Sequence, residues 1–366
     1  MLPSNPIIVI MQGVVAWNQW RRTQADTIPA PQLREALLIR AELPRINMSK
    51  VDSCLSNLSG ANLFQANLSQ AIFYTANFSQ ARMDLATLDR VDMREANLRD
   101  ASLIRVHAQE ATFAMADLHG SNLREGIFSN SDFCEASLEA ADGCMAQMEH
   151  CNLSYANLKG SLLYTANLRE ANLKHTNLEA ADFREANLTQ AVLEDAYGCN
   201  TSFARAILDR ALLTGATLTG ANLTMANLKL TILNQANLSK ALIKNSLLTG
   251  ANLIETNLCQ AQLQNSNLQK TDCRNALFNQ ANLENANFQG ADLSGANLSK
   301  AYLYGANLKG SKLHKTNFSH VDLSYTDLTD TDLSEAILTG TQLPAGYVVK
   351  KRTTIEPVQT FNSRVA

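Results

Sequence analysis

Residues 281–298 read ANLEN ANFQG ADLSG ANL, a five-residue motif that repeats without interruption. A large apolar residue, here called the centre, recurs every five residues, and alanine stands two positions before it. Centres fall at every residue number ending in 3 or 8 from Leu38 to Leu343, which gives 62 units with no insertion or deletion. An internal repeat of this regularity decides the fold before any other feature of the chain.

A five-residue period suits neither a straight strand nor a helix. Alternate residues of an extended chain point to opposite faces, so the centre and the small residue two positions earlier share one face. In a straight strand an odd period would swap the faces at every repeat, and in a helix of 3.6 residues per turn it would scatter the centres around the axis. A chain that turns a corner after each short extended piece keeps every centre on one central axis. Four corners close a square coil of about 20 residues.

This A(D/N)LXX pattern resembles that of the pentapeptide repeat family, over roughly residues 36–343. The resemblance implies an all-β solenoid, a right-handed quadrilateral β-helix. At four units per coil the chain would form about 15 coils and a rod roughly 70–75 Å long, given the usual spacing between strands. The run Trp-Asn-Gln-Trp-Arg at residues 17–21 is similar to the N-terminal segment of cyanobacterial members of the family.

The repeat divides the chain into one long domain with two short ends. Residues 1–35 are expected to form a capping helix and a linker, because Ile10, Val14 and Trp17 give residues 7–22 a single apolar stripe, which Ile7 and Trp20 extend. The β-helix is predicted at 36–343. Residues 344–366 are predicted to be a C-terminal cap, with Tyr347 folding over the last coil, followed by a mobile tail.

Two kinds of exception interrupt the inward positions. Ile46 is the one oversized residue in the small position, and five centres are not Leu, Phe, Met or Ile: Ser53, Ala108, Gly143, Gly198 and Cys273. Gly143 and Gly198 remove a core side chain. Each indicates either a pocket or bend, or a cavity filled by a shifted neighbour at a cost of order 1–3 kcal/mol relative to Leu.

Composition argues against several classes of protein. The net charge is −3, and residues 41–343 carry −8, so no basic face for nucleic acid is expected. The apolar run near the N-terminus is too short to span a membrane and lacks the features of a secretion signal. Seven cysteines without paired spacing favour a reducing compartment, and a cytoplasmic location is predicted. No metal, cofactor or catalytic motif is recognised, so no enzymatic activity is expected.

Function is therefore sought in the outward positions. The position just before each centre is usually Asn or Asp, and large apolar residues there are exceptions: Ile72, Ile127, Leu162, Val192, Tyr197, Ile207, Leu212, Ile232, Leu242, Leu247, Leu277, Tyr302 and Ile337. Val192, Leu212 and Ile232 are spaced by 20 residues, so they should stack on consecutive coils as an apolar ladder. Ile207 and Leu247 are expected on one adjoining face and Tyr197 on the other.

The ladder predicts a binding surface for a protein partner, because contiguous exposed apolar patches mark interaction sites. The alternative is that such residues simply suit exposed strands and stack on one another. An acidic group near the C-terminal end (Asp322, Asp327, Asp330, Asp332 and Glu335) is interpreted as Asp replacing Asn in a position that accepts either.

Three functions are compared. The first is a non-enzymatic protein-interaction scaffold with an unidentified protein partner, as the resemblance to a cyanobacterial regulator of differentiation implies. The second is a DNA mimic that inhibits a type II topoisomerase, as quinolone-resistance members of the family are; the weak negative charge and the many outward Lys and Arg residues argue against it. The third is a self-associating rod, in which the ladder pairs two copies as a homodimer.

Overall fold

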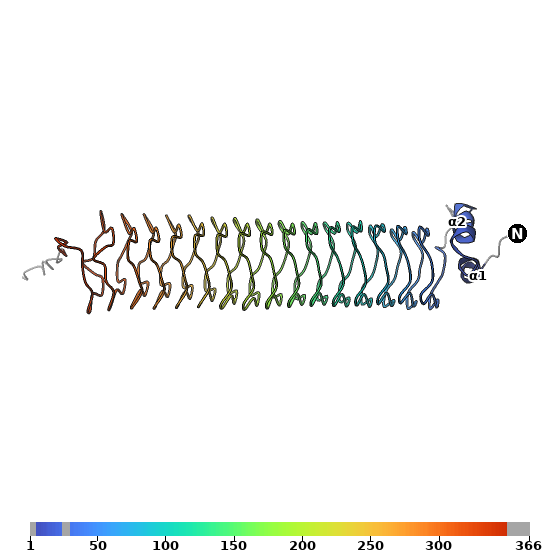
Figure 1. Ribbon diagram of the computed structural model, residues 1–366, viewed down its shortest axis with the longest axis horizontal. Helices are drawn as coiled ribbons and strands as arrows, with labels where there is room; N and C mark the ends of the chain where they lie inside the picture. Colours follow the sequence, from blue (N-terminus) through green and yellow to red (C-terminus); the bar gives the residue numbers. More distant parts are fainter. Residues whose placement is uncertain (1–4, 24–29, 350–366) are drawn as a thin grey trace, which may run out of the picture.

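The computed structural model describes residues 5–23 and 30–349. They form one elongated rod with two short helices at its N-terminal end (Figure 1). The chain advances steadily along the rod, so that residues close in sequence lie close along the axis and the two ends lie far apart. Each part of the rod therefore contacts only its neighbours, which is the property of a solenoid.

Four units form each coil. Parallel bridges join residues that are 20 apart, beginning with Gln32 and Asp52 and ending with Asp322 and Gln342. The paired positions are single residues rather than long strands. Pairing begins before the predicted start at residue 36: Leu33 is fully buried and continues the register of centres one unit toward the N-terminus.

Every backbone N–H of a regular unit has an acceptor. In the unit around Leu58, the Asn57 N–H donates to the preceding coil, and the N–H groups of Leu58 and Gly60 donate to the following coil, at 2.7–2.9 Å. The Ala61 N–H closes the turn on the Leu58 carbonyl at 3.0 Å. The remaining N–H, that of Ser59, donates to the Asn57 side-chain oxygen at 3.0 Å. The outward Asn or Asp thus completes the hydrogen bonding of its own unit, a role here called the Asx cap.

Nearly every corner places its last residue in the left-handed region, and Tyr325 and Glu335 are the exceptions among the described corners of the repeat. Gly60 has φ of 64°, and other residues whose numbers end in 0 or 5 have φ near this value although many carry side chains, as Ala180 does at 55°. A positive φ at the third residue of a hydrogen-bonded four-residue turn is the pattern of a type II turn. Most corners therefore share one shape, and this explains how a period of five is kept without insertions.

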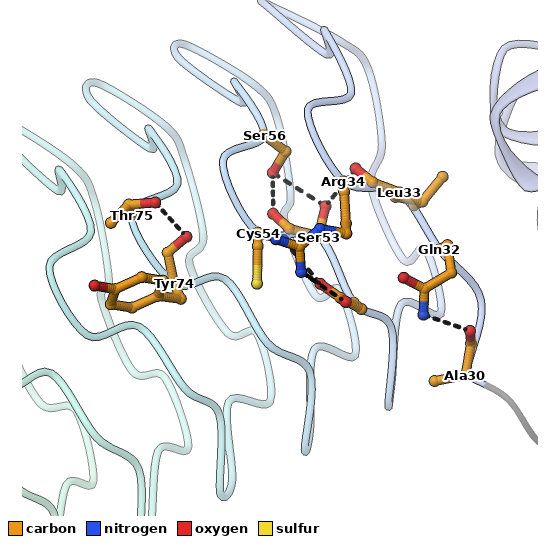
Figure 2. Close-up of polar contacts among 10 residues, drawn as sticks. Ala30, Gln32, Leu33, Arg34, Ser53, Cys54, Ser56, Tyr74 and Thr75 are labelled. Atoms are coloured by element: carbon orange, nitrogen blue, oxygen red, sulfur yellow. Dashed lines mark hydrogen bonds and ion pairs between the residues drawn. The ribbon is translucent and has the colours of Figure 1, made fainter.

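The core is a column of centres and small residues along the axis. Nearly all are fully buried, and phenylalanines stack between coils, as Phe113 and Phe133 do with ring centroids 4.8 Å apart. Ser53, a polar centre, is accommodated by local bonds: its hydroxyl donates to the Ser56 hydroxyl at 3.0 Å, and that of Ser56 donates to the Ser53 carbonyl at 2.6 Å (Figure 2).

The two glycine centres leave little space. A Cβ at Gly143 would lie 2.9 Å from Leu163 Cδ2, and a Cβ at Gly198 would lie 2.8 Å from Leu218 Cδ2. Leucines of the next coil occupy the space that a side chain at each glycine would fill. Of the two sequence interpretations, the structure therefore favours a shifted neighbour over a pocket.

The prediction of a single helix over residues 7–22 is wrong in one respect, because the structure contains two helices in this range. Helix α1 spans Pro6–Ile10, helix α2 spans Val14–Thr23, and Gly13, with φ of 97°, separates them. The Asn5 side chain caps α1 by accepting the Ile7 N–H at 2.9 Å. Ile7 is 42% exposed, so it does not extend the buried stripe.

Helix α2 is hydrogen-bonded to the first coil. Trp17 Nε1 donates to the Asn47 carbonyl at 2.6 Å, Arg21 Nη2 donates to the Ser49 carbonyl at 2.7 Å, and Asn18 Oδ1 accepts the Asn47 N–H at 2.8 Å. At the other end, Tyr347 packs against the core and its hydroxyl donates to the Thr331 carbonyl at 3.2 Å. The predicted mobile tail, residues 350–366, lies outside the described residues.

Candidate functional site

The apolar ladder consists of Val192, Leu212 and Ile232. Parallel bridges join Val192 to Leu212 and Leu212 to Ile232, so the three residues lie on consecutive coils of one face. Asn172 and Asn252 occupy the same position on the coils before and after. All three ladder side chains are half-buried, because each covers part of its neighbour.

The other three predicted site residues lie on different faces. Ile207 and Leu247 share one adjoining face, but Asn227 stands between them and they do not touch through consecutive coils. Tyr197 lies on the other adjoining face and is paired with Asn177 and Thr217. Because Tyr197 and Ile207 are two units apart in a four-sided coil, they lie on opposite sides of the rod. A partner with a flat surface can therefore contact the ladder face together with either the Tyr197 side or the Ile207 side. It cannot contact both sides at once.

A second feature coincides with the ladder and was missed in the sequence. Between residues 192 and 217, six consecutive units have no Asn or Asp before the centre. The N–H groups that an Asx cap would satisfy have no acceptor within the described part of the chain: Glu194, Cys199, Ala204, Asp209, Thr214 and Thr219. This stretch, residues 192–219, is called the uncapped belt. The absence of Asn and Asp from these six units is visible in the sequence. It predicts the uncapped belt only once the role of the Asx cap is known.

Charge changes sign at the same place. There are 20 acidic and 12 basic residues between residues 80 and 214, but four acidic and nine basic residues between 215 and 320. Six of the nine lie on the ladder face or its two corners: Lys229, Lys270, Arg274, Lys309, Lys312 and Lys315. The ladder therefore stands between an acidic and a basic segment, which the net charge of the whole repeat conceals.

Two buried cysteines of the core have strongly raised pKa values. Burial raises the pKa of the Cys151 and Cys273 thiols to about 12, so both stay protonated at neutral pH and serve as small apolar residues. Within residues 5–23 and 30–349, no group of three or more His, Cys, Asp or Glu side chains is arranged to hold a metal ion. No helix in these two ranges has the length and apolar character needed to cross a bilayer.

Three of the five carboxylates in the acidic group near the C-terminal end have a structural role. The carboxylates of Asp322, Asp327 and Asp332 accept the N–H groups of residues 324, 329 and 334, each at 2.8–2.9 Å. These bonds are Asx caps, in which Asp acts as Asn does elsewhere. This arrangement supports the interpretation that Asp replaces Asn there.

Comparison with known proteins identifies the class. The family model described as pentapeptide repeats (8 copies) matches the chain in overlapping segments that together span residues 56–142 and 146–340. The chain belongs to the pentapeptide repeat family. No curated protein sequence matches it.

Three solved structures are similar to parts of the chain. HetL, a pentapeptide repeat protein involved in heterocyst differentiation regulation in the cyanobacterium Nostoc sp. strain PCC 7120, is 35% identical over 62% of this chain and 91% of its own, with a TM-score of 0.29. Rfr23 of the cyanobacterium Cyanothece 51142 is 31% identical over 31% of this chain and 64% of its own, with a TM-score of 0.21. QnrB1, a plasmid-mediated fluoroquinolone resistance protein, is 21% identical over 48% of this chain and 94% of its own, with a TM-score of 0.25.

Proposed function

We propose that this protein is a non-enzymatic scaffold that binds a partner protein through the ladder face, with Ile207 and Leu247 or with Tyr197 at the edge of the contact. The observation that carries the proposal is the stacking of Val192, Leu212 and Ile232 on three consecutive coils, a position that Asn or Asp occupies in most other units. Apolar side chains in an outward position gain from burial against a partner.

The proposed scaffold is a right-handed, four-sided β-helix of about 15 coils, as family membership and the bridges 20 residues apart support. Helix α2 is proposed to cap its N-terminal end, because its side chains bond to backbone groups that a preceding coil would otherwise satisfy. A cytoplasmic location stays a prediction.

The charge reversal at the ladder supports this choice of surface. A partner seated there would meet an acidic segment on one side and a basic segment on the other. Two flanking segments of opposite charge would orient a partner protein and would disfavour a partner whose surface carries one sign of charge. Electrostatic complementarity mainly sets the specificity and the association rate of a complex.

The proposal is tested by capture from a lysate of the native host. The bait carrying Leu212→Arg and Ile232→Arg is compared with wild type and with a control carrying Thr87→Arg and Thr112→Arg. The control places arginine in the same position of the unit, outside the uncapped belt, and removes no Asx cap. We expect wild type and the control to retain one protein that the ladder variant loses. Equal retention by all three baits would contradict the proposed surface.

A second candidate, self-association, is favoured by the same charge reversal. A two-fold axis through the ladder would set two rods antiparallel, with the acidic segment of each copy against the basic segment of the other. Analytical ultracentrifugation at 50 mM and 500 mM salt tests this arrangement. A dimer at low salt that is lost with Leu212→Arg and Ile232→Arg would establish it, and a monomer at both salt concentrations at the highest soluble concentration would exclude it.

Inhibition of a topoisomerase remains the alternative from the sequence. Many carboxylates of the acidic segment are paired with arginine or lysine, as Glu110 is with Arg90 and Glu125 with Arg105. Paired carboxylates imitate a DNA backbone poorly. A gyrase supercoiling assay with micromolar protein is expected to show no inhibition.

A further inference from the structure

Two corners of the rod carry the same arrangement of tyrosine and arginine. Arg94 lies over the ring of Tyr74, with its guanidinium carbon 5.7 Å from the ring centroid. The Asp92 carboxylate holds this guanidinium through two hydrogen bonds of 2.7 and 2.9 Å. The Tyr74 hydroxyl donates to Glu95 at 2.9 Å. The arginine is therefore fixed between an aromatic face and a carboxylate, which is a favourable site for a cation.

The arrangement recurs 90 residues later in every part. Arg184 lies over Tyr164, again at 5.7 Å, and Asp182 holds its guanidinium. The Tyr164 hydroxyl donates to Glu185 at 3.1 Å. In both cases the aspartate, arginine and glutamate follow the tyrosine by 18, 20 and 21 residues, so they come from the next coil.

A third tyrosine in the same position of its unit lacks the arginine. Tyr304 is followed at the same distances by Asp322, Ser324 and Tyr325. The carboxylate is kept, and its Oδ1 accepts the Ser324 N–H at 2.8 Å. Serine stands where the other two corners have arginine, and a second aromatic residue stands where they have glutamate. The tyrosine and the aspartate of the other two corners are kept, but the arginine that lies between them is absent.

The surroundings of Tyr304 enlarge the aromatic surface. The Tyr302 ring is nearly parallel to it, with centroids 6.4 Å apart, and the Tyr325 ring lies 5.0 Å away at 45°. These three tyrosines and Asp322 line a pocket of about 50 Å³. The three rings are 48–68% exposed. Within the described ranges, no lysine or arginine lies over any of them, whereas Tyr74 and Tyr164 are both covered.

We propose that Tyr302, Tyr304, Tyr325 and Asp322 bind the guanidinium group of an arginine on a partner protein. Aromatic faces attract cations, and a planar guanidinium also stacks on a ring and bonds to a carboxylate at the same time. Asp92 and Asp182 show that an aspartate in this position binds guanidinium through both of its oxygens. The site lies more than three coils from the ladder, so it is independent of the proposed binding surface.

The proposal is tested by NMR on full-length protein with ¹³C-labelled tyrosine rings. The probe is acetyl-Gly-Gly-Arg-Gly-Gly-amide, and the control probe replaces arginine with citrulline, which has the same shape and no charge. We expect saturable shifts of the Tyr302, Tyr304 and Tyr325 resonances with the arginine peptide, with a dissociation constant on the order of 1 mM for so small a ligand. N-Ethylguanidinium should shift the same resonances, because it carries the same group.

Variants decide whether the site is the one described. Ser324→Arg with Tyr325→Glu gives this corner the residues of the other two, and its own arginine should then weaken peptide binding at least tenfold. Tyr304→Leu should also abolish the shifts of Tyr302 and Tyr325. Tyr74→Leu, at a corner that already holds its arginine, should leave peptide binding unchanged.

Three results would overturn the proposal. The first is the absence of saturable shifts in wild type, and the second is an equal response to the citrulline peptide. The third concerns the arginines of the chain itself, Arg352 and Arg364, which lie outside the described residues. If replacing both with glutamine tightened peptide binding, the chain's own arginine, and not a partner's, would be the ligand.

Discussion

The Asn or Asp before each centre serves the backbone more than the surface. Its side-chain oxygen accepts the N–H two residues later, as Asn222 does for Thr224 at 3.1 Å, and this N–H makes no backbone hydrogen bond to a neighbouring coil. A backbone donor left without a partner costs free energy comparable to a lost hydrogen bond. The preference for Asn and Asp thus follows from the shape of the corner.

Replacing Asn222 with alanine should lower the free energy of opening of its coil by about 1 kcal/mol, because the Thr224 N–H loses its acceptor. Ser202 occupies the same position one coil earlier and makes no such bond, so Ser202→Ala should change that free energy by less than about 0.5 kcal/mol. Native-state hydrogen exchange measures both. Equal effects would mean that the Asx cap contributes little.

Aspartate caps should make the C-terminal coils sensitive to acid. Hydrogen bonds from residues 324 and 329 hold the pKa of Asp322 and of Asp327 below the ordinary value of 3.8. A lowered folded-state pKa gives stability that is full above the unfolded pKa and is lost as the pH falls through the folded one. The melting temperature should therefore be flat between about pH 5 and 8 and fall below about pH 4.

The matched control for this prediction replaces both aspartates with asparagine. Asparagine accepts the same hydrogen bonds and does not titrate. Between pH 5 and pH 3, the melting temperature of the double variant should decrease less than that of wild type. An identical decline in the two proteins would show that these caps do not cause the acid sensitivity.

At the level of elements, α2 is hydrogen-bonded to backbone groups of the first coil. The Trp17 indole and the Arg21 guanidinium donate to two carbonyls of the first coil, and Asn18 accepts one of its N–H groups. In the middle of the rod the preceding coil supplies these bonds. The proposed capping role therefore explains the run Trp-Asn-Gln-Trp-Arg. This run places two hydrogen-bond donors and one acceptor on one face of the helix.

Trp17→Phe should expose the function of this helix. Phenylalanine keeps most of the buried ring but removes the indole N–H, which leaves the Asn47 carbonyl without its donor and should cost about 1–3 kcal/mol. Trp20→Phe is the control, because the Trp20 indole N–H makes no hydrogen bond in the described part of the chain. Hydrogen exchange of residues 33–50 should accelerate in the first variant only. If both variants behaved alike, packing rather than hydrogen bonding would hold the helix.

The sequence predicted the repeating elements well because one physical rule acts at every unit. Inward positions must be apolar, so the register of centres can be counted, and the buried Leu58 and Ala61 lie where the period puts them. The elements outside the repeat follow no such rule. The break of the N-terminal helix depends on Gly13 adopting a φ of 97°, which an apolar stripe does not reveal.

The candidate site could be predicted only in part. The spacing of 20 residues correctly placed the ladder on consecutive coils, because every coil contains the same number of residues. The site at Tyr304 was not predicted, because it is defined by the absence of an arginine in the next coil. That absence becomes visible only after the contacts around Tyr74 and Tyr164 are known.

Across the whole molecule, the uncapped belt is the longest run of consecutive units without an Asn or Asp before the centre. Six successive units there lack the Asx bond, and Gly198 leaves one core position without a side chain. Since each coil is held only by its neighbours, local stability should have a minimum at this belt. The proposed partner surface lies on it, so binding and local opening should be coupled.

Hydrogen exchange along the rod tests this expectation. The amides of residues 194, 199, 204, 209, 214 and 219 should exchange faster than the capped amides of the same unit position, such as those of Ser239 and Cys259. Peptide-level mass spectrometry resolves the two groups. A uniform rate along residues 150–300 would mean that the missing caps do not weaken the belt.

The claim that the ladder face binds a partner is tested most directly by cross-linking. A photoreactive phenylalanine is placed at Leu212 and, as a control, at Thr112, which has the same position on the same face five coils away. Both proteins are irradiated in host lysate, and the adducts are identified by mass spectrometry. The account predicts one protein attached at position 212 and not at position 112. The same adducts at both positions, or none at either, would contradict it.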